Sequence, residues 1–356
     1  MTVSDADEPR LIGELVPLEA ELVSEQAPDG DRDQHVSDAT ASDLRRATAA
    51  NTERAYARWW NMALAWCEQE GRTPLPMTAQ TVAEFIGHLK RSISPTTGKP
   101  YSPASLDQAL SAIRTAHFRA GFEGQPQSRA ARDIIKVHRQ DRAREGWRPR
   151  RAKPVTLDVL RLLLSQCDTD SLSGRRNAAI LVLGYGLMGR RSELAAVTIE
   201  QVTVTDEWVT VFIPISKTDT NARGEDVDIP RAIAPDLDAG VIVRSYLEGL
   251  AEHGVTAGPL LRRVDVWGNV GPSMTAASVN DIVKRLAKEA NLTAAERTTA
   301  HGLRAGAPTD AAERGVPVPF IAEHGRWSKN STQVLTYVRP ADRRRNNPLL
   351  PRDNRA

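Results

Sequence analysis

Residues 301–339 read HGLRAGAPTDAAERGVPVPFIAEHGRWSKNSTQVLTYVR, and this stretch carries most of the information about fold and function. His301 and Arg304 stand three positions apart near the start of a predicted helix, so their side chains share one face. An imidazole transfers protons near neutral pH, and a guanidinium donates to two phosphate oxygens at once. Free backbone N–H groups at a helix N-terminus also favour an anion. The pair therefore predicts a phosphate site, although H-x-x-R alone occurs by chance in many chains.

The second half of this stretch adds a tryptophan and a tyrosine. Trp327 offers an N–H donor and a large apolar face, and Tyr337 follows ten residues later on a predicted helix that ends before Pro340. The segment ERGVPVP, residues 313–319, predicts a turn that lets Arg304 and Trp327 converge. Surrounding arginines would lower the pKa of a tyrosine from its ordinary value near 10 and so activate it. Taken alone, Tyr337 is better explained as a half-buried structural tyrosine.

A proline interrupts the helical pattern after the histidine and the arginine. Pro308 stands four residues beyond Arg304 and removes the N–H that would bond the Arg304 carbonyl, at a cost of about 3 kcal/mol in a helix interior. We expect the helix either to kink or to restart at Pro308 as a first-turn residue. Either outcome would change the direction in which Arg304 points.

Two further cationic motifs precede this stretch. In GRRSEL, Arg190 and Glu193 lie three apart on a helix predicted over residues 174–197, so they can meet. A partly buried arginine needs a carboxylate or a phosphate, and a purely structural Arg–Glu pair is the alternative. Lys217, in ISKTDT, follows a predicted strand and opens a turn. It is either a solvated lysine or a mobile cation that reaches a neighbouring groove.

The rest of the C-terminal half predicts a mainly helical domain with a small three-stranded antiparallel sheet. Alternating residues predict three strands, at 201–205, 207–216 and 225–230. Beyond them the pattern is helical again. No P-loop motif is present, and we expect no nucleotide cofactor. Cys67 and Cys167 lack zinc-type spacing and favour reduced thiols in a cytosol.

The N-terminal half predicts four or five amphipathic helices, followed by an arginine-rich connection. Apolar residues recur at helical spacing from about residue 39 to residue 144. The segment GWRPRRAKPVT then breaks the pattern and holds four cationic residues, Arg148, Arg150, Arg151 and Lys153. Their charges would repel one another unless an anion lay between them. A solvated linker is the alternative.

Charge is distributed unevenly along the chain. Residues 1–33 hold ten acidic and two basic side chains, so the remainder carries about ten net positive charges although the whole chain carries +2. We expect the acidic segment to be disordered and the basic body to suit a polyanionic partner, with a solvated positive surface as the alternative. The sequence shows neither a signal-peptide pattern nor an apolar run of membrane-spanning length, which favours a cytoplasmic protein.

The ordered set of these motifs resembles the tyrosine recombinases, or phage integrase family, and is most similar to Cre-like members. The resemblance covers the linker and the C-terminal half strongly and the N-terminal helices weakly. Arg190 has the family's offset to Glu193, which Arg191 lacks, whereas His324 stands three residues too close to Arg304 to replace Trp327. The resemblance implies six catalytic residues and one supporting residue: Arg190, Lys217, His301, Arg304, Trp327 and the nucleophile Tyr337, supported by Glu193.

The family's chemistry implies a role for each of these residues. Tyr337 would attack a DNA phosphodiester, leaving a 3′-phosphotyrosyl link and a free 5′-hydroxyl. Arg190 and Arg304 would hold the non-bridging oxygens. His301 would assist removal of the phenol proton, and Lys217 would protonate the leaving 5′-oxygen. Trp327 would donate to the phosphate. The bond energy is kept in the ester, so the resemblance implies neither ATP nor a metal nor another cofactor.

The resemblance also implies an architecture and partners. A C-shaped clamp of two domains would close on double-stranded DNA with inverted-repeat sites, as a homotetramer that exchanges strands through a Holliday junction. A tail beyond the catalytic domain would dock on the neighbouring protomer through Leu349 and Leu350. The alternative is a catalytically impaired DNA-binding relative whose site Pro308 has spoiled. The implied boundaries are an acidic tail at 1–38, a helical core-binding (SAM-like) domain at 39–145, a basic linker at 146–154, a catalytic domain at 155–340 and a C-terminal tail at 341–356.

Overall fold

The chain divides into two compact units, Met1–Pro149 and Arg150–Ala356, and the division falls inside the segment predicted as the linker. Of the two predicted tails, the described residues include only 37, 38 and 349. None of the described helices is long and apolar enough to cross a membrane. The computed structural model describes residues 37–40, 43, 50–122, 124, 126–149, 152–216, 223–328, 331–338 and 349.

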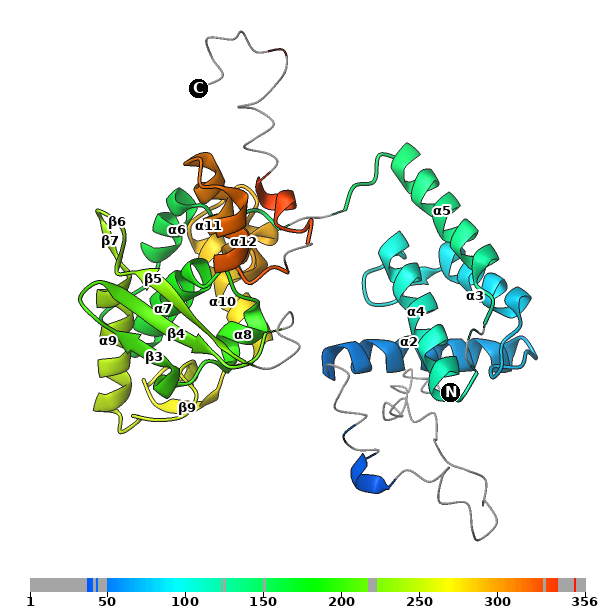
Figure 1. Cartoon of the computed structure of the whole chain (residues 1–356), viewed down its shortest axis with the longest axis horizontal. Coiled ribbons are helices and arrows are strands. Elements are labelled where there is room, and N and C mark those ends of the chain that lie inside the picture. Colours follow the sequence, from blue (N-terminus) through cyan, green and yellow to red (C-terminus); the bar gives the residue numbers. More distant parts are fainter. Residues whose placement is uncertain are drawn as a thin grey trace, which may run out of the picture. The chain divides into compact units, whose positions relative to one another are not determined.

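The first unit is helical, as expected, in its described part (Figure 1). A short antiparallel hairpin, β1 (Ile93–Ser94) with β2 (Lys99–Pro100), separates its two middle helices. Aromatic side chains dominate its core: Trp59, Trp60, Trp66 and Phe85 are buried. Between residues 50 and 144, the described helices are α2 (Ala50–Gln69), α3 (Ala79–Arg91), α4 (Pro103–Arg119) and α5 (Arg129–Arg144).

Capping residues explain where two of these helices begin. The Thr78 hydroxyl accepts the backbone N–H of Thr81 at 3.1 Å, at the N-terminus of α3. The Ser102 hydroxyl accepts the N–H of Ser105 at 3.1 Å, and Pro103 occupies the first turn of α4. Each hydroxyl satisfies a donor that the helix leaves free, and proline has no such donor to lose. The predicted start of α4 at Ser102–Pro103 is confirmed.

The second unit is built around a central helix, α7 (Leu172–Gly186), whose side chains are buried on nearly all sides. The helices that pack most extensively against it are α6 (Leu157–Leu164), α8 (Arg191–Ala196), α9 (Ala239–Glu252), α10 (Ala276–Glu289) and α11 (Ala300–Glu313). Burying each large aliphatic side chain of α7 stabilises the unit by about 1.5–3 kcal/mol.

The predicted three-stranded antiparallel sheet is confirmed as β3 (Val202–Val204), β4 (Trp208–Ile213) and β5 (Glu225–Pro230), in that order. Val211 faces Val227 across the β4–β5 ladder, and both are buried. The expectation that the chain is only helical beyond β5 is wrong. Strands of two to four residues are too short to show alternation in the sequence, and they form two more hairpins, β6 (Ala232–Ala234) with β7 (Leu237–Asp238) and β8 (Arg262–Val264) with β9 (Val270–Ser273).

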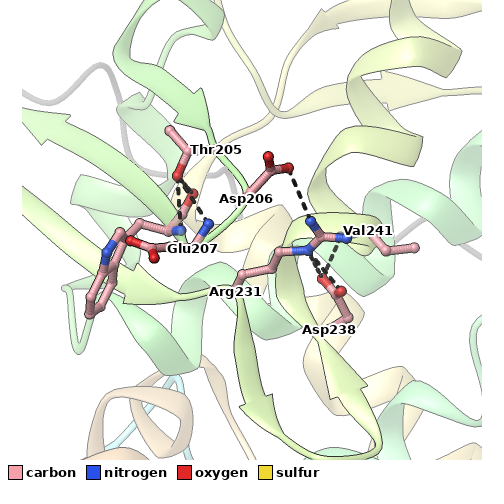
Figure 2. A network of polar contacts seen from close by, with 7 residues as sticks. Thr205, Asp206, Glu207, Arg231, Asp238 and Val241 are labelled. Carbon is pink, nitrogen blue, oxygen red and sulfur yellow. Dashed lines mark hydrogen bonds and ion pairs between the residues drawn. The ribbon is translucent and has the colours of Figure 1, made fainter.

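A polar network joins the end of this sheet to α9 (Figure 2). Arg231 follows β5 and donates from Nε to Asp238 Oδ2 at 2.9 Å, and its Nη1 lies 3.5 Å from Asp206 in the β3–β4 turn. Asp238 also caps α9 by accepting the N–H of Val241 at 2.8 Å. One guanidinium therefore fixes a turn, a hairpin and a helix start together.

The single helix predicted over residues 174–197 is wrong, because the chain breaks between α7 and α8. Met188 has a left-handed φ of 46°, and Arg190 is an extended N-cap residue with φ −75° and ψ 149°. The break exposes the Met188 carbonyl, which accepts a hydrogen bond from Arg304 Nη1. Arg190 and Glu193 therefore meet across a helix N-terminus and not along one continuous helix.

The helix that carries His301 and Arg304 continues through its proline. α11 runs from Ala300 to Glu313 with Pro308 inside it, so the alternative of a restart at Pro308 is wrong. After Gly315, with a φ of 82°, the chain reverses into α12 (Val318–His324), as the sequence predicts. A helical turn at residues 335–338 follows the segment beyond α12.

Candidate active site

A cationic pocket of about 590 Å³ lies at the N-terminal end of α11. It holds an imidazole, a phenol and four cationic side chains, and none of the described residues that line it is acidic. Such a pocket suits an anion, because like charges crowded together are stabilised by a negative partner. The lining residues are Gly189, Arg190, Arg191, Ser192, Asn280, Lys284, Thr299, His301, Arg304, Gln333 and Tyr337.

Glu193 anchors two arginines beside this pocket. The backbone N–H of Arg190 donates to Glu193 Oε2 at 2.9 Å, and Arg190 Nη1 donates to Oε1 at 2.6 Å. Arg326 Nη2 donates to Oε2 at 3.1 Å. Burial raises the pKa of Glu193, but the hydrogen bonds from Arg190 and the charges of both arginines outweigh it and hold that pKa below its ordinary value. The carboxylate is therefore ionised and orients Arg190 into the pocket.

Arg304 is buried at the pocket wall, with 4% of its surface exposed. Nη1 donates to the Met188 carbonyl and Nη2 to the Gly325 carbonyl at 3.3 Å. Burial, reinforced by the charge of Arg190, lowers the pKa of Arg304 to about 10, so the guanidinium stays charged at neutral pH. Backbone carbonyls thus fix this cation in place without neutralising it.

Trp327 packs beneath the arginine and the tyrosine. The Arg304 guanidinium lies 4.4 Å from its ring centroid, and the Tyr337 ring lies 5.7 Å away. Gly325 is needed for this packing, because a Cβ there would lie 1.8 Å from the indole. Within the described part of the chain, the buried Nε1 of Trp327 has no hydrogen-bond partner. A buried donor without an acceptor costs about 1–3 kcal/mol, and Trp327 is not among the residues that line the cationic pocket.

Tyr337 and His301 face each other in the pocket. The phenol oxygen lies 3.2 Å from His301 Nε2, within reach for donation to a neutral imidazole. Burial lowers the pKa of His301, and the charges of Arg304 and Arg191 lower it further. His301 is therefore neutral near pH 7 and can accept the phenol proton.

The expected direction of the Tyr337 pKa is wrong. Burial raises the pKa of Tyr337 and outweighs the opposing charges of Arg304 and Arg190. The phenol therefore stays protonated in the pocket and needs a base at the moment it reacts. His301 is placed to be that base.

The remaining sequence-predicted residues lie apart from this pocket or outside the described residues. Lys217 lies outside them, in the connection between the paired strands β4 and β5. Of the four linker cations, Arg150 and Arg151 also lie outside, whereas Arg148 and Lys153 are described and exposed. His324, the rejected rival, bonds the Gly186 carbonyl at 2.7 Å through Nε2 and does not line the pocket.

Arg326, Asn280 and Lys284 are among the site residues that were missed from the sequence. Arg326 completes the Glu193 cluster from a left-handed turn with a φ of 54°, and its position in HGRW, between the essential Gly325 and Trp327, was the available signal. Asn280 and Lys284 stand one turn apart on α10 and line the pocket. Asn280 Oδ1 also accepts the N–H of Ala300 at 3.3 Å, so α10 holds the first turn of α11.

The mainly helical second unit, with its small antiparallel sheets and a cationic pocket around a tyrosine, agrees with the resemblance to the tyrosine recombinases. Residues 153–344 match the phage integrase family, and the chain belongs to that family. It is 28% identical over 307 residues to an integrase/recombinase xerD homolog of Selenomonas ruminantium, covering 86% of each chain. It is 23% identical over 304 residues to the recombinase cre of Escherichia phage P1, covering 80% of this chain and 84% of that one.

Solved structures support the fold. A lambda integrase (75–356) dimer bound to a COC′ core site matches with a TM-score of 0.54 at 15% identity, covering 84% of this chain and 92% of that one. A lambda integrase tetramer bound to a Holliday junction matches with a TM-score of 0.51 at 15% identity, covering 82% and 76%. The chain thus has the integrase core-binding and catalytic folds, in a family of DNA cleaving and rejoining enzymes.

Proposed function

We propose that this protein is a site-specific tyrosine recombinase that cleaves and rejoins duplex DNA through a 3′-phosphotyrosyl intermediate. One observation carries the proposal. The Tyr337 hydroxyl lies 3.2 Å from a neutral imidazole, in a pocket lined by four cationic side chains and no acidic one among its described residues. A phenol, a base and several cations are what phosphodiester transfer to tyrosine requires.

The first step forms one bond and breaks another. Tyr337 attacks the phosphorus while its proton passes to His301 Nε2, and the bond from phosphorus to the 5′-oxygen breaks. Arg190 and Arg304 stabilise the charge that develops on the non-bridging oxygens, each by about 3–4 kcal/mol as for an oxyanion-hole donor. Trp327 Nε1 gains an acceptor in the same phosphate. Lys217 protonates the leaving 5′-oxygen.

The second step reverses the first with a different strand. The 5′-hydroxyl of a partner strand gives its proton to the now neutral Lys217 and attacks the phosphotyrosyl phosphorus. The bond from phosphorus to the Tyr337 oxygen breaks, and the phenol oxygen takes back the proton that His301 holds. Bond number and charge are conserved, so the exchange needs no external energy source. Repeated on the second pair of strands, it resolves a Holliday junction.

The proposal extends to assembly. Solved relatives are bound to DNA as dimers and tetramers, and we propose a homotetramer on an inverted-repeat site. The two units would close on DNA as a clamp, with core-binding, linker and catalytic segments at 39–145, 146–154 and 155–340. Phosphate contacts by Arg148, Arg150, Arg151 and Lys153 would position the protein without reading sequence.

An apolar cavity gives the proposed tail of the neighbouring protomer a place to dock. The cavity, about 970 Å³, lies beside the tyrosine segment and is lined by Ile213, Val318, Trp327, Val334 and Leu335 among others. In the proposed tetramer, Leu349 and Leu350 of one protomer enter the cavity of the next. Leu349 is 90% exposed, and Leu350 lies outside the described residues.

The alternative of a catalytically impaired DNA-binding relative rested on Pro308. The continuous course of α11 weakens it, because Arg304 still lines the pocket on the same helix as His301.

A random-sequence pool of nicked duplexes tests the proposal without requiring that the target site be identified first. The nick lets the short 5′-hydroxyl fragment diffuse away after cleavage, so the covalent complex cannot reverse and survives SDS. We expect SDS-resistant DNA adducts with the natural protein and with Tyr56→Phe, and none with Tyr337→Phe. All three should still shift DNA in a salt-dependent way. Salt-sensitive shifts without any adduct from the natural protein would favour the impaired relative.

A further inference from the structure

The end of the linker is seated directly on the helix that carries His301 and Arg304. Three backbone N–H groups of residues 153–157, here called the docked segment, donate to α11 or to the turn before it. Lys153 N donates to the Arg297 carbonyl at 3.0 Å and Val155 N to the Gly302 carbonyl at 2.9 Å. Leu157 N donates to Asp310 Oδ2 at 2.8 Å, on the last turn but one of α11.

Two glycines on α11 allow this close approach. A Cβ on Gly302 would lie 2.4 Å from the Lys153 carbonyl oxygen, and a Cβ on Gly306 would lie 1.7 Å from the Val155 carbonyl oxygen. The obstructing atoms are backbone, so no side-chain rotation would relieve the clash. The glycines are four residues apart and flank Arg304, so the docked segment contacts the helix at the level of the reacting groups.

Further contacts, beyond those at the two glycines, hold the docked segment against α11. Val155 is fully buried in the core of the second unit. Asp310 Oδ2 accepts the Tyr185 hydroxyl at 2.7 Å as well as the Leu157 N–H, so one carboxylate joins the docked segment, α7 and α11. Burial raises the pKa of Tyr185, which keeps its hydroxyl a donor to this carboxylate.

We propose that the docked segment is a positioning element of the active site, which couples the linker to the orientation of His301 and Arg304. The proposal rests on the proposed function, because its consequence is the rate of the cleavage step. A displacement of residues 153–157 shifts α11, and a shift of α11 changes the distance from His301 Nε2 to the Tyr337 hydroxyl. Gly302 and Gly306 are positioning residues and touch no substrate.

Glycine-to-alanine variants of the full-length protein test the coupling. Gly306→Ala introduces the shorter contact and Gly302→Ala the longer, whereas Gly271→Ala on β9 is a matched control whose Cβ would meet only ordinary contacts at 3.6 Å. We measure single-turnover cleavage of the nicked duplex at saturating protein, the dissociation constant of the uncleaved complex, and the pH midpoint of the cleavage rate.

We expect Gly306→Ala to lower the cleavage rate constant by about 10²-fold, the cost of misplacing a reacting group by about 1 Å. Gly302→Ala should lower it less, and the dissociation constant should change by less than about threefold in both. The pH midpoint should move, because the environment of His301 changes. A merely destabilised protein would lose reactive fraction while its rate constant and pH midpoint stayed unchanged.

Hydrogen exchange keeps the test decisive if a variant folds poorly. We expect the Lys153 and Val155 amides to lose protection in Gly306→Ala while the amides of α7 keep theirs. The positioning role is overturned if the natural protein cleaves and Gly306→Ala cleaves at the same rate, or if α7 loses protection together with the docked segment. If neither the natural protein nor Gly271→Ala forms adducts, the proposed function fails and the positioning role fails with it.

Discussion

Two histidines, one in each unit, show how differently the two halves of the molecule use the same side chain. Burial lowers the pKa of both His117 and His301. In the first unit, His117 Nε2 accepts the Met77 N–H at 2.8 Å and Nδ1 lies 2.8 Å from the Ile113 carbonyl, so backbone groups satisfy both ring nitrogens. In the second unit, His301 Nε2 faces the Tyr337 hydroxyl. One imidazole is a structural element, and the other is placed to exchange a proton.

The cations of the two units differ in the same way. In the first unit Arg119 is neutralised by Glu53 through two hydrogen bonds of 2.6 and 2.8 Å. In the second, the pocket lining holds four cations and no acidic residue within the described part of the chain, although Arg190 pairs with Glu193 beside the pocket. A folded protein keeps such a charge excess only where it has a use, because mutual repulsion opposes it. The comparison teaches that an active site is recognised by polar and charged groups that are not satisfied or neutralised within the fold itself.

Lysine substitutions at the two arginines give the largest expected contrast. Arg304→Lys keeps the charge but loses the planar guanidinium that can donate to two phosphate oxygens at once. We expect the cleavage rate to fall about 10³-fold, as when an oxyanion donor is removed. Arg119→Lys, in the neutralised pair, should leave the cleavage rate unchanged and cost at most about 1 kcal/mol of stability. Single-turnover cleavage and urea unfolding measure both effects. Equal cleavage rates for Arg304→Lys and the natural protein would show that Arg304 is no more important for cleavage than Arg119.

The pH dependence of cleavage should report His301. The pKa of His301 lies below its ordinary value of 6.5, and only the neutral imidazole accepts the phenol proton. The rate should therefore be highest above pH 6.5 and fall as the pH drops through the lowered pKa. His301→Gln should lose this dependence and cleave about 10²-fold more slowly. A rate in the natural protein that stays flat at every acidic pH at which the protein remains folded would exclude His301 as the base.

A substitution of Lys284 tests whether the pocket contacts a DNA phosphate. It lines the pocket from α10, and no ion pair is found for it among the described residues. Lys284→Ala should lower the cleavage rate about tenfold, and the slope of log affinity against log salt should fall by about 0.9, the loss of one phosphate contact. Arg285→Ala, which removes an exposed pair with Glu289, is the neighbouring control for the rate. An unchanged salt slope for Lys284→Ala would place this lysine away from DNA.

His117 should have the smallest effect on catalysis. Its folded pKa lies below 6.5, so the unfolded chain binds more protons as the pH falls through 6.5, and stability present above that pH is lost below it. His117→Gln should reduce this pH dependence and cost about 1–3 kcal/mol at pH 7.5, because buried backbone partners are left unpaired. The cleavage rate constant of the folded fraction should not change. Urea unfolding at pH 7.5 and pH 5.5 distinguishes this role from a catalytic one.

Sequence patterns predicted the elements that are long or strictly periodic. The β4–β5 ladder was predictable because Val209, Val211 and Ile213 alternate with polar or exposed residues. The β8–β9 hairpin was not, because its strands hold three and four residues. The break after α7 was hidden within an apolar helical pattern, because what holds it open is the distant guanidinium of Arg304, which bonds the Met188 carbonyl.

The residues of the candidate site also fall into those that the sequence predicted and those that it could not. The convergence of His301, Arg304 and Tyr337 on one pocket was predictable from order and spacing, since the family resemblance assigns the proposed chemistry to these residues. Lys284 was not, because α10 reaches the pocket only through tertiary packing. The raised pKa of Tyr337 also escaped prediction, since burial depends on neighbours that the local sequence does not name.

The central claim, that Tyr337 carries the DNA in a covalent ester, is tested most directly by locating the attached nucleotide. Adducts from the nicked duplex are digested with nuclease and protease, and the modified peptide is sequenced by mass spectrometry. The chain has five tyrosines, and we predict a nucleotide linked through its 3′-phosphate to Tyr337 alone. A nucleotide on Tyr56, Tyr101, Tyr185 or Tyr246, or a 5′-phosphate linkage at Tyr337, would contradict it.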